Sequence, residues 1–268
     1  MKIFKKVMVL VLVVGMTLGL SACGNSSKSS DAASKNDDSV LVVGFDQNFP
    51  PFGYKNKKGK FVGFDIEAAK ACAKEMGVDI KLQPIDWDSK DMELESGTID
   101  CIWNGFTING REKKYTWTEP YMNNYQVFVV KSDSGINTIA DLKDKNVEVQ
   151  KESSAETAIN DDKDLKASFA QYTSVADYNT AMMDLDSGAA DAVAMDYFVA
   201  LDQTKGKDQF KILDEKLSQE QYAVGFEKGN TKLRDQVQKA MKKMVKDGTY
   251  AKLSEKYFGE NVVVLSAD

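Results

Sequence analysis

The segments MELESGTID (residues 92–100) and MDLDSGAAD (residues 183–191) decide the fold of this chain. Both follow the pattern Met-x-Leu-x-Ser-Gly-x-x-Asp, and every shared residue is offset by the same 91 positions. In each segment the pattern indicates a helix that ends at a glycine able to adopt a left-handed cap, followed by a strand. The repeat therefore predicts two similar lobes within one chain.

The segments around the repeat alternate strands and helices, which predicts an α/β architecture with mainly parallel sheets. In the first half the predicted strands are residues 40–45, 78–85 and 98–104, with helices at 64–77 and 89–97. In the second half the predicted strands are 146–150, 168–172 and 190–196, and helices begin at Ser154 and Ser174. The same order on both sides supports two lobes.

Two alternating, β-prone segments, residues 125–133 and 222–230, are predicted to cross between the lobes. The first enters the second lobe and the second returns, so the helical segments 231–248 and 249–259 complete the first lobe. These boundaries assign residues 40–127 and 223–268 to lobe 1 and residues 128–222 to lobe 2. Two extended crossings can form a hinge for a closing rotation.

Composition limits the classes of function. The 268 residues are 43% hydrophobic and 28% charged, as expected for a globular protein. A net charge of −6 argues against a nucleic-acid partner, because no basic surplus is present to neutralise phosphates. The absence of histidine removes the commonest general base and the commonest metal ligand. We expect neither a cofactor nor a metal site.

The N-terminus has the pattern of a targeting segment. Lysines 2, 5 and 6 precede an apolar run over residues 7–20, which is shorter than the roughly 20 residues of a spanning helix. Small residues then lead into Cys23, which resembles a bacterial lipobox. The pattern predicts a lipoprotein signal peptide over residues 1–22, lipidation of Cys23 and a flexible polar tether over residues 23–39. An ordinary signal peptide with an incidental cysteine is the alternative.

Two further cysteines, Cys72 and Cys101, each lie in an apolar pattern, one in a predicted helix and one in a predicted strand. Two cysteines make neither a disulfide framework nor a zinc site. Buried thiols are the favoured interpretation, and a single disulfide between them is the alternative.

Polar and aromatic residues follow the predicted strands of both halves. The offset of 91 residues places Gly105 and Asp196 at equivalent strand ends. In open α/β sheets, ligands bind beyond the carboxyl ends of strands, so facing lobes would share one cleft. The candidate ligand-binding residues are Asp46, Phe49, Trp87, Asn104, Gly105, Thr107, Arg111, Gln150, Ser153, Ser154, Met195 and Asp196.

These residue types match the groups of an amino acid zwitterion. Arg111 can hold a carboxylate through two parallel hydrogen bonds, and the helix that begins near Ser154 offers further N–H donors. Asp196 can bind an α-ammonium group. Each residue also has an ordinary structural interpretation: Arg111 can open a solvated charge run, Asp196 can cap a helix, and Trp87 can be a core aromatic. Their convergence at equivalent strand ends favours the binding site.

Four segments together resemble solute-binding protein family 3, the polar amino acid receptors of ABC importers. They are GFDQNFPPFGY (residues 44–54), GKFVGFDIEAAKACAKEMG (59–77), NGFTINGREKKYTWTEPYM (104–122) and DGTYAKLSEKYFGE (247–260). The resemblance covers residues 40–259 and implies a type II periplasmic-binding-protein-like fold with two α/β lobes joined by two crossing strands.

The resemblance also implies a role for individual residues. It assigns the ligand carboxylate to Arg111, a hydroxyl contact to Thr107 and the amine to Asp196. It assigns aromatic walls to Phe49 and Trp87, and a backbone donor to Ser154. Two departures bear on this assignment: the spacing from Thr107 to Arg111 is one residue shorter than usual, and Glu152 stands where a glycine is usual.

The predicted function is an extracytoplasmic receptor, anchored to the cell membrane by lipid, that captures an L-amino acid and delivers it to an ABC permease. The predicted ligand is polar and neutral, such as glutamine or cystine, in preference to a basic amino acid. An enzyme on the same fold, a dehydratase of an aromatic-acid precursor, is the alternative. It would need an acid or base placed over a reactive carbon, and no histidine is present. A sensor domain is a third possibility, which would require a signalling module.

Overall fold

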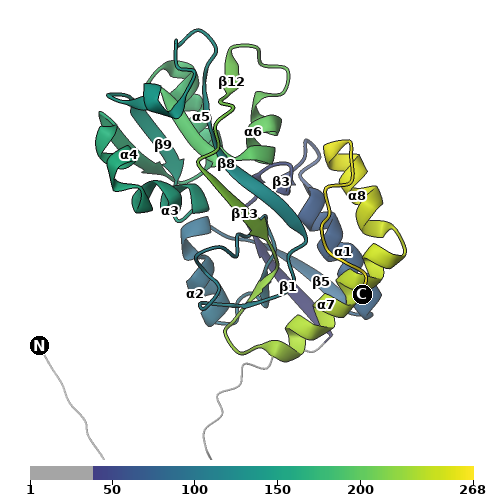
Figure 1. Cartoon of the computed structure of the whole chain (residues 1–268). Helices are drawn as coiled ribbons and strands as arrows, with labels where there is room; N and C mark the ends of the chain where they lie inside the picture. The colour runs from purple at the N-terminus through teal and green to yellow at the C-terminus, as the bar shows by residue number, and fades with distance from the viewer. Residues whose placement is uncertain (1–38) are drawn as a thin grey trace, which may run out of the picture. The chain divides into compact units, whose positions relative to one another are not determined.

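The computed structural model describes residues 39–268. The predicted signal peptide, Cys23 and the tether up to residue 38 lie outside the described residues. Within them, two sheets with flanking helices form two α/β lobes, which β8 and β13 connect (Figure 1).

Lobe 1 is built on a five-stranded sheet with the order β5-β1-β6-β14-β7. Its strands are β1 (Val40–Phe45), β5 (Asp79–Pro84), β6 (Cys101–Ile102), β7 (Thr116–Trp117) and β14 (Gly225–Phe226). The other elements are the helices α1 (Phe64–Met76), α2 (Lys90–Glu95), α7 (Thr231–Lys246) and α8 (Thr249–Phe258), the 3₁₀ helix η1 (Trp87–Ser89), and a small sheet of β2 (Asn48–Phe49), β3 (Gly53–Lys55) and β4 (Phe61–Val62).

Lobe 2 is built on a six-stranded sheet with the order β10-β9-β11-β8-β12, in which β13 also pairs with β8. Its strands are β8 (Met122–Lys131), β9 (Asn146–Gln150), β10 (Gln171–Val175), β11 (Ala192–Asp196), β12 (Phe210–Ile212) and β13 (Ser218–Tyr222). Its helices are α3 (Ser154–Asp161), α4 (Lys163–Ser168), α5 (Tyr178–Ser187), α6 (Tyr197–Thr204) and the 3₁₀ helix η2 (Ile139–Leu142).

The sequence repeat corresponds to a structural repeat. β1, β5 and β6 are parallel neighbours in lobe 1, as β9, β10 and β11 are in lobe 2. Gly97 and Gly188 follow the two helices with positive φ angles of 72° and 85°. The N–H of Asp100 donates to the Val42 carbonyl, and its carboxylate accepts from the Val42 N–H at 2.7 Å. Asp191 makes the same reciprocal pair with Asn146 on β9, with its carboxylate at 2.8 Å.

The two crossing strands lie side by side and antiparallel, with Met122 opposite Tyr222 and Gln126 opposite Ser218 (Figure 1). The predicted second crossing, residues 222–230, was wrong in position: β13 ends at Tyr222, and the separate strand β14 follows. The β13 sequence SQEQY is polar, so periodicity alone gives no signal for a strand there. Pairing with β8 supplies its backbone hydrogen bonds instead.

Other boundaries in lobe 2 also differ from prediction. β10 covers Gln171–Val175 and not 168–172, because α4 extends to Ser168. Asp177, and not a residue near Ser174, caps α5, and its carboxylate accepts from the Thr180 N–H at 3.0 Å. Aspartate is among the preferred N-cap residues, and Asp177 lies three positions after Ser174.

Cys72 and Cys101 are free thiols, both fully buried. Burial raises the pKa of the Cys72 thiol to about 12, so it behaves as a small apolar core residue. Among residues 39–268 no helix has the length and apolar character needed to cross a membrane. No group of side chains in that same range could hold a metal ion.

Candidate functional site

A narrow cavity lies between the two lobes. Its lining brings together ten of the twelve candidate residues: Phe49, Trp87, Asn104, Gly105, Thr107, Arg111, Gln150, Ser153, Ser154 and Asp196. Six come from lobe 1 and follow its strands, and four come from β9, the start of α3 and the end of β11. The predicted convergence of strand ends on one cleft is what the structure shows.

The other two candidates are placed elsewhere. Met195 is wholly buried in the hydrophobic core, because successive side chains of β11 point to opposite faces and Asp196 occupies the cavity side. Asp46 lies beside the cavity: its carboxylate accepts from the Gln150 side chain at 2.8 Å and from the Asn48 N–H at 2.7 Å. Burial raises the pKa of Asp46 to about 6. Its contact with Gln150 joins lobe 1 to β9 of lobe 2.

Gly105 is held by an aspartate that the sequence analysis missed. Its N–H donates at 2.6 Å to Asp65, a fully buried residue of α1 that also accepts from the Tyr121 hydroxyl at 2.9 Å. Burial raises the pKa of Asp65 to about 7. Gly105 has a φ of 55°, and an added Cβ would come within 3.0 Å of the Phe49 ring. The position therefore requires glycine, both for the backbone and for the adjoining wall.

Asp196 ends β11 inside a dense polar cluster. One carboxylate oxygen accepts from the side-chain amides of Asn124 at 3.0 Å and Gln126 at 2.8 Å and from the Tyr222 hydroxyl. The other accepts from the Tyr178 hydroxyl at 3.4 Å. Burial, followed by the nearby Glu220 carboxylate, raises the pKa of Asp196 to about 7. The carboxylate is well oriented and has no cationic partner among residues 39–268.

Arg111 reaches across the cavity from lobe 1. Its guanidinium donates to the backbone carbonyl of Glu152 at 3.0 Å and to that of Thr107 at 3.4 Å, and it lies 5.4 Å from the centre of the Phe106 ring. A turn in which the Arg111 N–H donates to the Ile108 carbonyl at 2.8 Å accommodates the short spacing from Thr107. The arginine is thus a cavity residue and does not belong to a solvated charge run.

The start of α3 faces the same cavity. Ser153 caps the helix and accepts from the Glu156 N–H at 3.0 Å. The carboxylate of Glu156 turns back to the N–H of Glu152 at 2.6 Å, one residue before the position a standard capping box would use. The Ser154 hydroxyl accepts from Thr107 of lobe 1 at 3.3 Å. A helix N-terminus and two hydroxyl groups therefore meet opposite Arg111.

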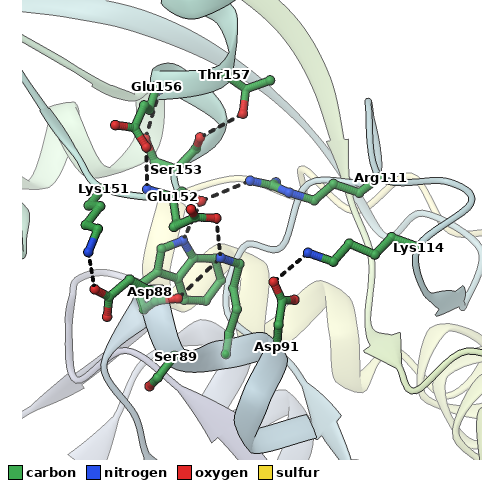
Figure 2. A network of polar contacts seen from close by, with 12 residues as sticks. Asp88, Ser89, Asp91, Arg111, Lys114, Lys151, Glu152, Ser153, Glu156 and Thr157 are labelled. Carbon is green, nitrogen blue, oxygen red and sulfur yellow. Dashed lines mark hydrogen bonds and ion pairs between the residues drawn. The ribbon is translucent and has the colours of Figure 1, made fainter. Parts of the chain in front are cut away.

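Figure 2 shows that Glu152 is a meeting point between the lobes. Its backbone carbonyl accepts hydrogen bonds from both the Arg111 guanidinium and the Trp87 indole N–H, the latter at 3.2 Å. Its carboxylate lies 3.5 Å from the ammonium group of Lys90. Glu152 holds a φ of 59°, the left-handed conformation that suits the glycine usual at this position. Nearby, Lys151 and Asp88 form an exposed ion pair of 2.8 Å across the same boundary.

The family model of bacterial extracellular solute-binding proteins, family 3, matches residues 41–260. The chain belongs to this family.

Individual relatives cover most of the chain. The L-cystine-binding protein TcyJ of Escherichia coli strain K12 is 36% identical over 230 residues, which span 83% of this chain and 84% of TcyJ. The structure resembles a substrate-binding protein of an ABC uptake transporter from Streptococcus pneumoniae, solved with bound histidine. The TM-score is 0.81 and the identity 34%, over 85% of this chain and 95% of that protein. It also resembles the ancestral amino acid-binding protein AncCDT-1, a precursor of cyclohexadienyl dehydratase, with a TM-score of 0.76 and 34% identity over 82% and 96% of the two chains.

Several residues of this solute-binding protein's site escaped the sequence analysis. Tyr178 lies 91 residues after Trp87, its ring centre is 6.0 Å from that of Phe49, and it contacts Asp196. The repeat offset was the signal that could have found it. Asn124, Gln126 and Glu220 carried no comparable signal, because polar residues on the crossing strands are buried only by the pairing of β8 with β13.

Proposed function

We propose that this solute-binding protein captures one L-amino acid with a polar, uncharged side chain and delivers it to the permease of an ABC importer. One observation carries the proposal: among the ten lining residues, Arg111 is the only cation and Asp196 the only anion. That charge set complements the carboxylate and ammonium groups of a zwitterion and leaves no further charge for a basic or acidic side chain.

In the proposed binding mode, Arg111 and the start of α3 bind the α-carboxylate from opposite lobes. Asp196 binds the α-ammonium group, helped by Thr107 and the Gly105 carbonyl. Phe49 and Trp87 enclose the ligand side chain. Asn104, Thr107 and Gln150 also line the cavity, and these uncharged polar side chains suit a polar ligand side chain such as that of glutamine.

A thermal-shift screen tests the ligand class. The protein from residue 24 onward is screened against the twenty common amino acids, cystine and ornithine. We expect the largest stabilisation from a neutral polar amino acid, with glutamine and cystine as the first candidates. A preference for arginine, lysine or ornithine over all neutral ligands would contradict the proposed charge balance, and no stabilisation by any of them would contradict the function.

Ligand binding is proposed to close the two lobes about β8 and β13, with residues 40–127 and 223–268 moving against residues 128–222. The contacts of Glu152, Gln150 and Ser154 with lobe 1 would form on closure. Small-angle scattering should show a smaller radius of gyration at saturating ligand than in ligand-free protein. Equal radii in a sample shown to be open without ligand would contradict a closing rotation.

We also propose that Cys23, which lies outside the described residues, carries a lipid that holds the protein at the outer face of the cytoplasmic membrane. The Leu-Ser-Ala-Cys segment and the polar residues after it support this. Cys23→Ser should leave the protein unprocessed or release it from the membrane. Normal processing and retention of the variant would exclude lipidation.

The relation to AncCDT-1 makes a dehydratase the second candidate, since that binding protein is a precursor of one. Its acid or base would have to come from the cavity lining, where Asp196 is the sole titratable acid and is already placed for the ammonium group. We therefore infer binding without turnover. Incubation with the substrate of cyclohexadienyl dehydratase and analysis of the products should show no dehydration above background.

A further inference from the structure

Glu220 lies beside Asp196 at the ammonium end of the cavity. It belongs to the crossing strand β13 and is 3% exposed, as is Asp196. One Glu220 oxygen accepts from the side-chain amides of Asn124 at 2.7 Å and Gln126 at 2.8 Å. The same two nitrogens donate to Asp196. Because the two carboxylates share both donors, they are close neighbours in a buried site.

No lysine or arginine among residues 39–268 forms an ion pair with either carboxylate. The other groups that face Asp196 are the hydroxyls of Tyr178 on α5 and Tyr222 on β13, both of which are neutral donors. Arg111 lines the same cavity but donates to two backbone carbonyls. Burial and repulsion from the neighbouring Glu220 carboxylate therefore both oppose a negative charge on Asp196.

We propose that Asp196, buried beside the Glu220 carboxylate, holds a proton in ligand-free protein and releases it when the ammonium group of an amino acid binds. This inference rests on the proposed function, because Asp196 must be the residue that receives the ammonium group. Glu220 does not line the cavity, so it acts through Asp196 as a positioning residue. The direction of the Asp196 pKa, raised by burial and then by Glu220, agrees with a proton held on Asp196.

Asp196 couples affinity to pH in a defined direction. Below the pKa of Asp196 in ligand-free protein, each bound amino acid displaces a proton, so affinity falls by up to about tenfold for each unit of decreasing pH. Above that pKa Asp196 is already ionised and affinity no longer depends on pH through it. Ligand should therefore bind more weakly in an acidified medium than in a neutral one.

Titration calorimetry with L-glutamine and L-cystine measures the proton directly. Titrations at about pH 6 in two buffers of different ionisation enthalpy should show close to one proton released per ligand by the wild-type protein. Glu220→Gln preserves the size of the side chain and removes its charge. We expect the variant to release fewer protons at that pH, and its curve of affinity against pH to move to lower pH.

Glu148→Gln is the matched control. Glu148 lies in the same sheet, is 9% exposed and also has a pKa raised by burial, but it does not line the cavity. This variant should keep the wild-type proton count.

Binding by the wild type without proton release would overturn the proposal while leaving the proposed function intact, as would an unchanged proton count in a folded Glu220→Gln protein. Failure of both amino acids to bind the wild type would contradict the proposed ligand, and the proton release from Asp196 with it.

Discussion

Asp196 and Glu152 both lie at the cleft between the lobes, but their carboxylates differ in burial and in charged partners. Asp196 is 3% exposed and surrounded by side-chain amides and hydroxyls, with no cation among the described residues. The side chain of Glu152 is 52% exposed, and its carboxylate pairs with Lys90 of the other lobe. The two carboxylates thus differ in whether the protein supplies a positive partner. Asp196 has none and requires a positive group from the ligand, whereas Glu152 is paired with Lys90.

This difference separates ligand recognition from lobe contact. A buried charge left unpaired is costly, whereas an exposed pair is screened by solvent and contributes little. The inner end of the cavity should therefore determine affinity and the choice of ligand. The outer contacts should mainly affect how long the lobes stay together.

The largest effect should come from Asp196→Asn. Removing the carboxylate leaves the ligand ammonium group buried without its partner, a loss of about 2–5 kcal/mol, or roughly 30-fold to several thousand-fold in affinity. Calorimetry measures the loss, with folding checked by circular dichroism. Asp186→Asn, an exposed change on α5 of the same lobe, is the control and should bind normally. Wild-type affinity in a folded Asp196→Asn protein would remove Asp196 from the site.

Arg111→Ala should have a smaller effect, because the guanidinium is partly exposed and the start of α3 remains available to the ligand carboxylate. We expect a loss of about 1.5–3 kcal/mol, or roughly 10- to 150-fold in affinity. Arg234→Ala changes the only other arginine of the chain, which lies on α7, and should leave affinity unchanged.

Arg111→Lys sharpens the same comparison, since lysine keeps the charge without the paired N–H donors. It should fall between the wild type and the alanine variant. If Arg111→Ala binds as tightly as the wild type, the zwitterion model of the cavity is wrong.

Glu152→Gly tests the outer contacts. Glycine suits the φ of 59° and keeps the carbonyl that accepts from Trp87 and Arg111, but it leaves Lys90 without its carboxylate. The Lys90 side chain is only 2% exposed, but its ammonium group keeps its hydrogen bond to the Trp87 carbonyl at 3.3 Å and its position over the Trp87 ring. We therefore expect a loss of about 0.5–1 kcal/mol, less than about fivefold in affinity, seen mainly as faster ligand dissociation. Stopped-flow dissociation measures it. Glu152→Gln separates the charge from the side-chain volume, and an unchanged dissociation rate in both variants would mean that the ion pair does not hold the lobes together.

Lys151→Ala should have the smallest effect. Lys151 and Asp88 form an ion pair whose side chains are 56% and 40% exposed. Solvent and salt screen such a pair, so we expect no measurable change in affinity at physiological ionic strength. A large loss that persists at high salt would show that the outer contacts contribute more to closure than their exposure indicates.

Much of the site could be predicted from local patterns. Residues such as Thr107 and Arg111 lie directly after a strand, so the rule for open α/β sheets locates them without any knowledge of packing. The prediction of Met195 as a site residue was wrong, because side chains alternate along β11 and its neighbour Asp196 faces the cavity. Asp65 and Glu220 were missed for another reason. Asp65 acts on Gly105, which is 40 positions away, and Glu220 acts on Asp196, which is 24 positions away. Local sequence patterns do not indicate either contact.

The sequence by itself determined the two α/β halves, their equivalent strand ends and most of the cavity lining. These follow from short-range features: hydrophobic periodicity, helix caps and a repeat at a constant offset. Only the tertiary structure decided that Glu220 lies against Asp196 and that Lys90 finds its carboxylate on the other lobe. Both depend on the antiparallel pairing of β8 with β13 and on contact between the lobes. The physical reason is that charge–charge interaction and loss of solvation are set by distance and burial in the folded chain, and neither is encoded in the spacing of residues along it.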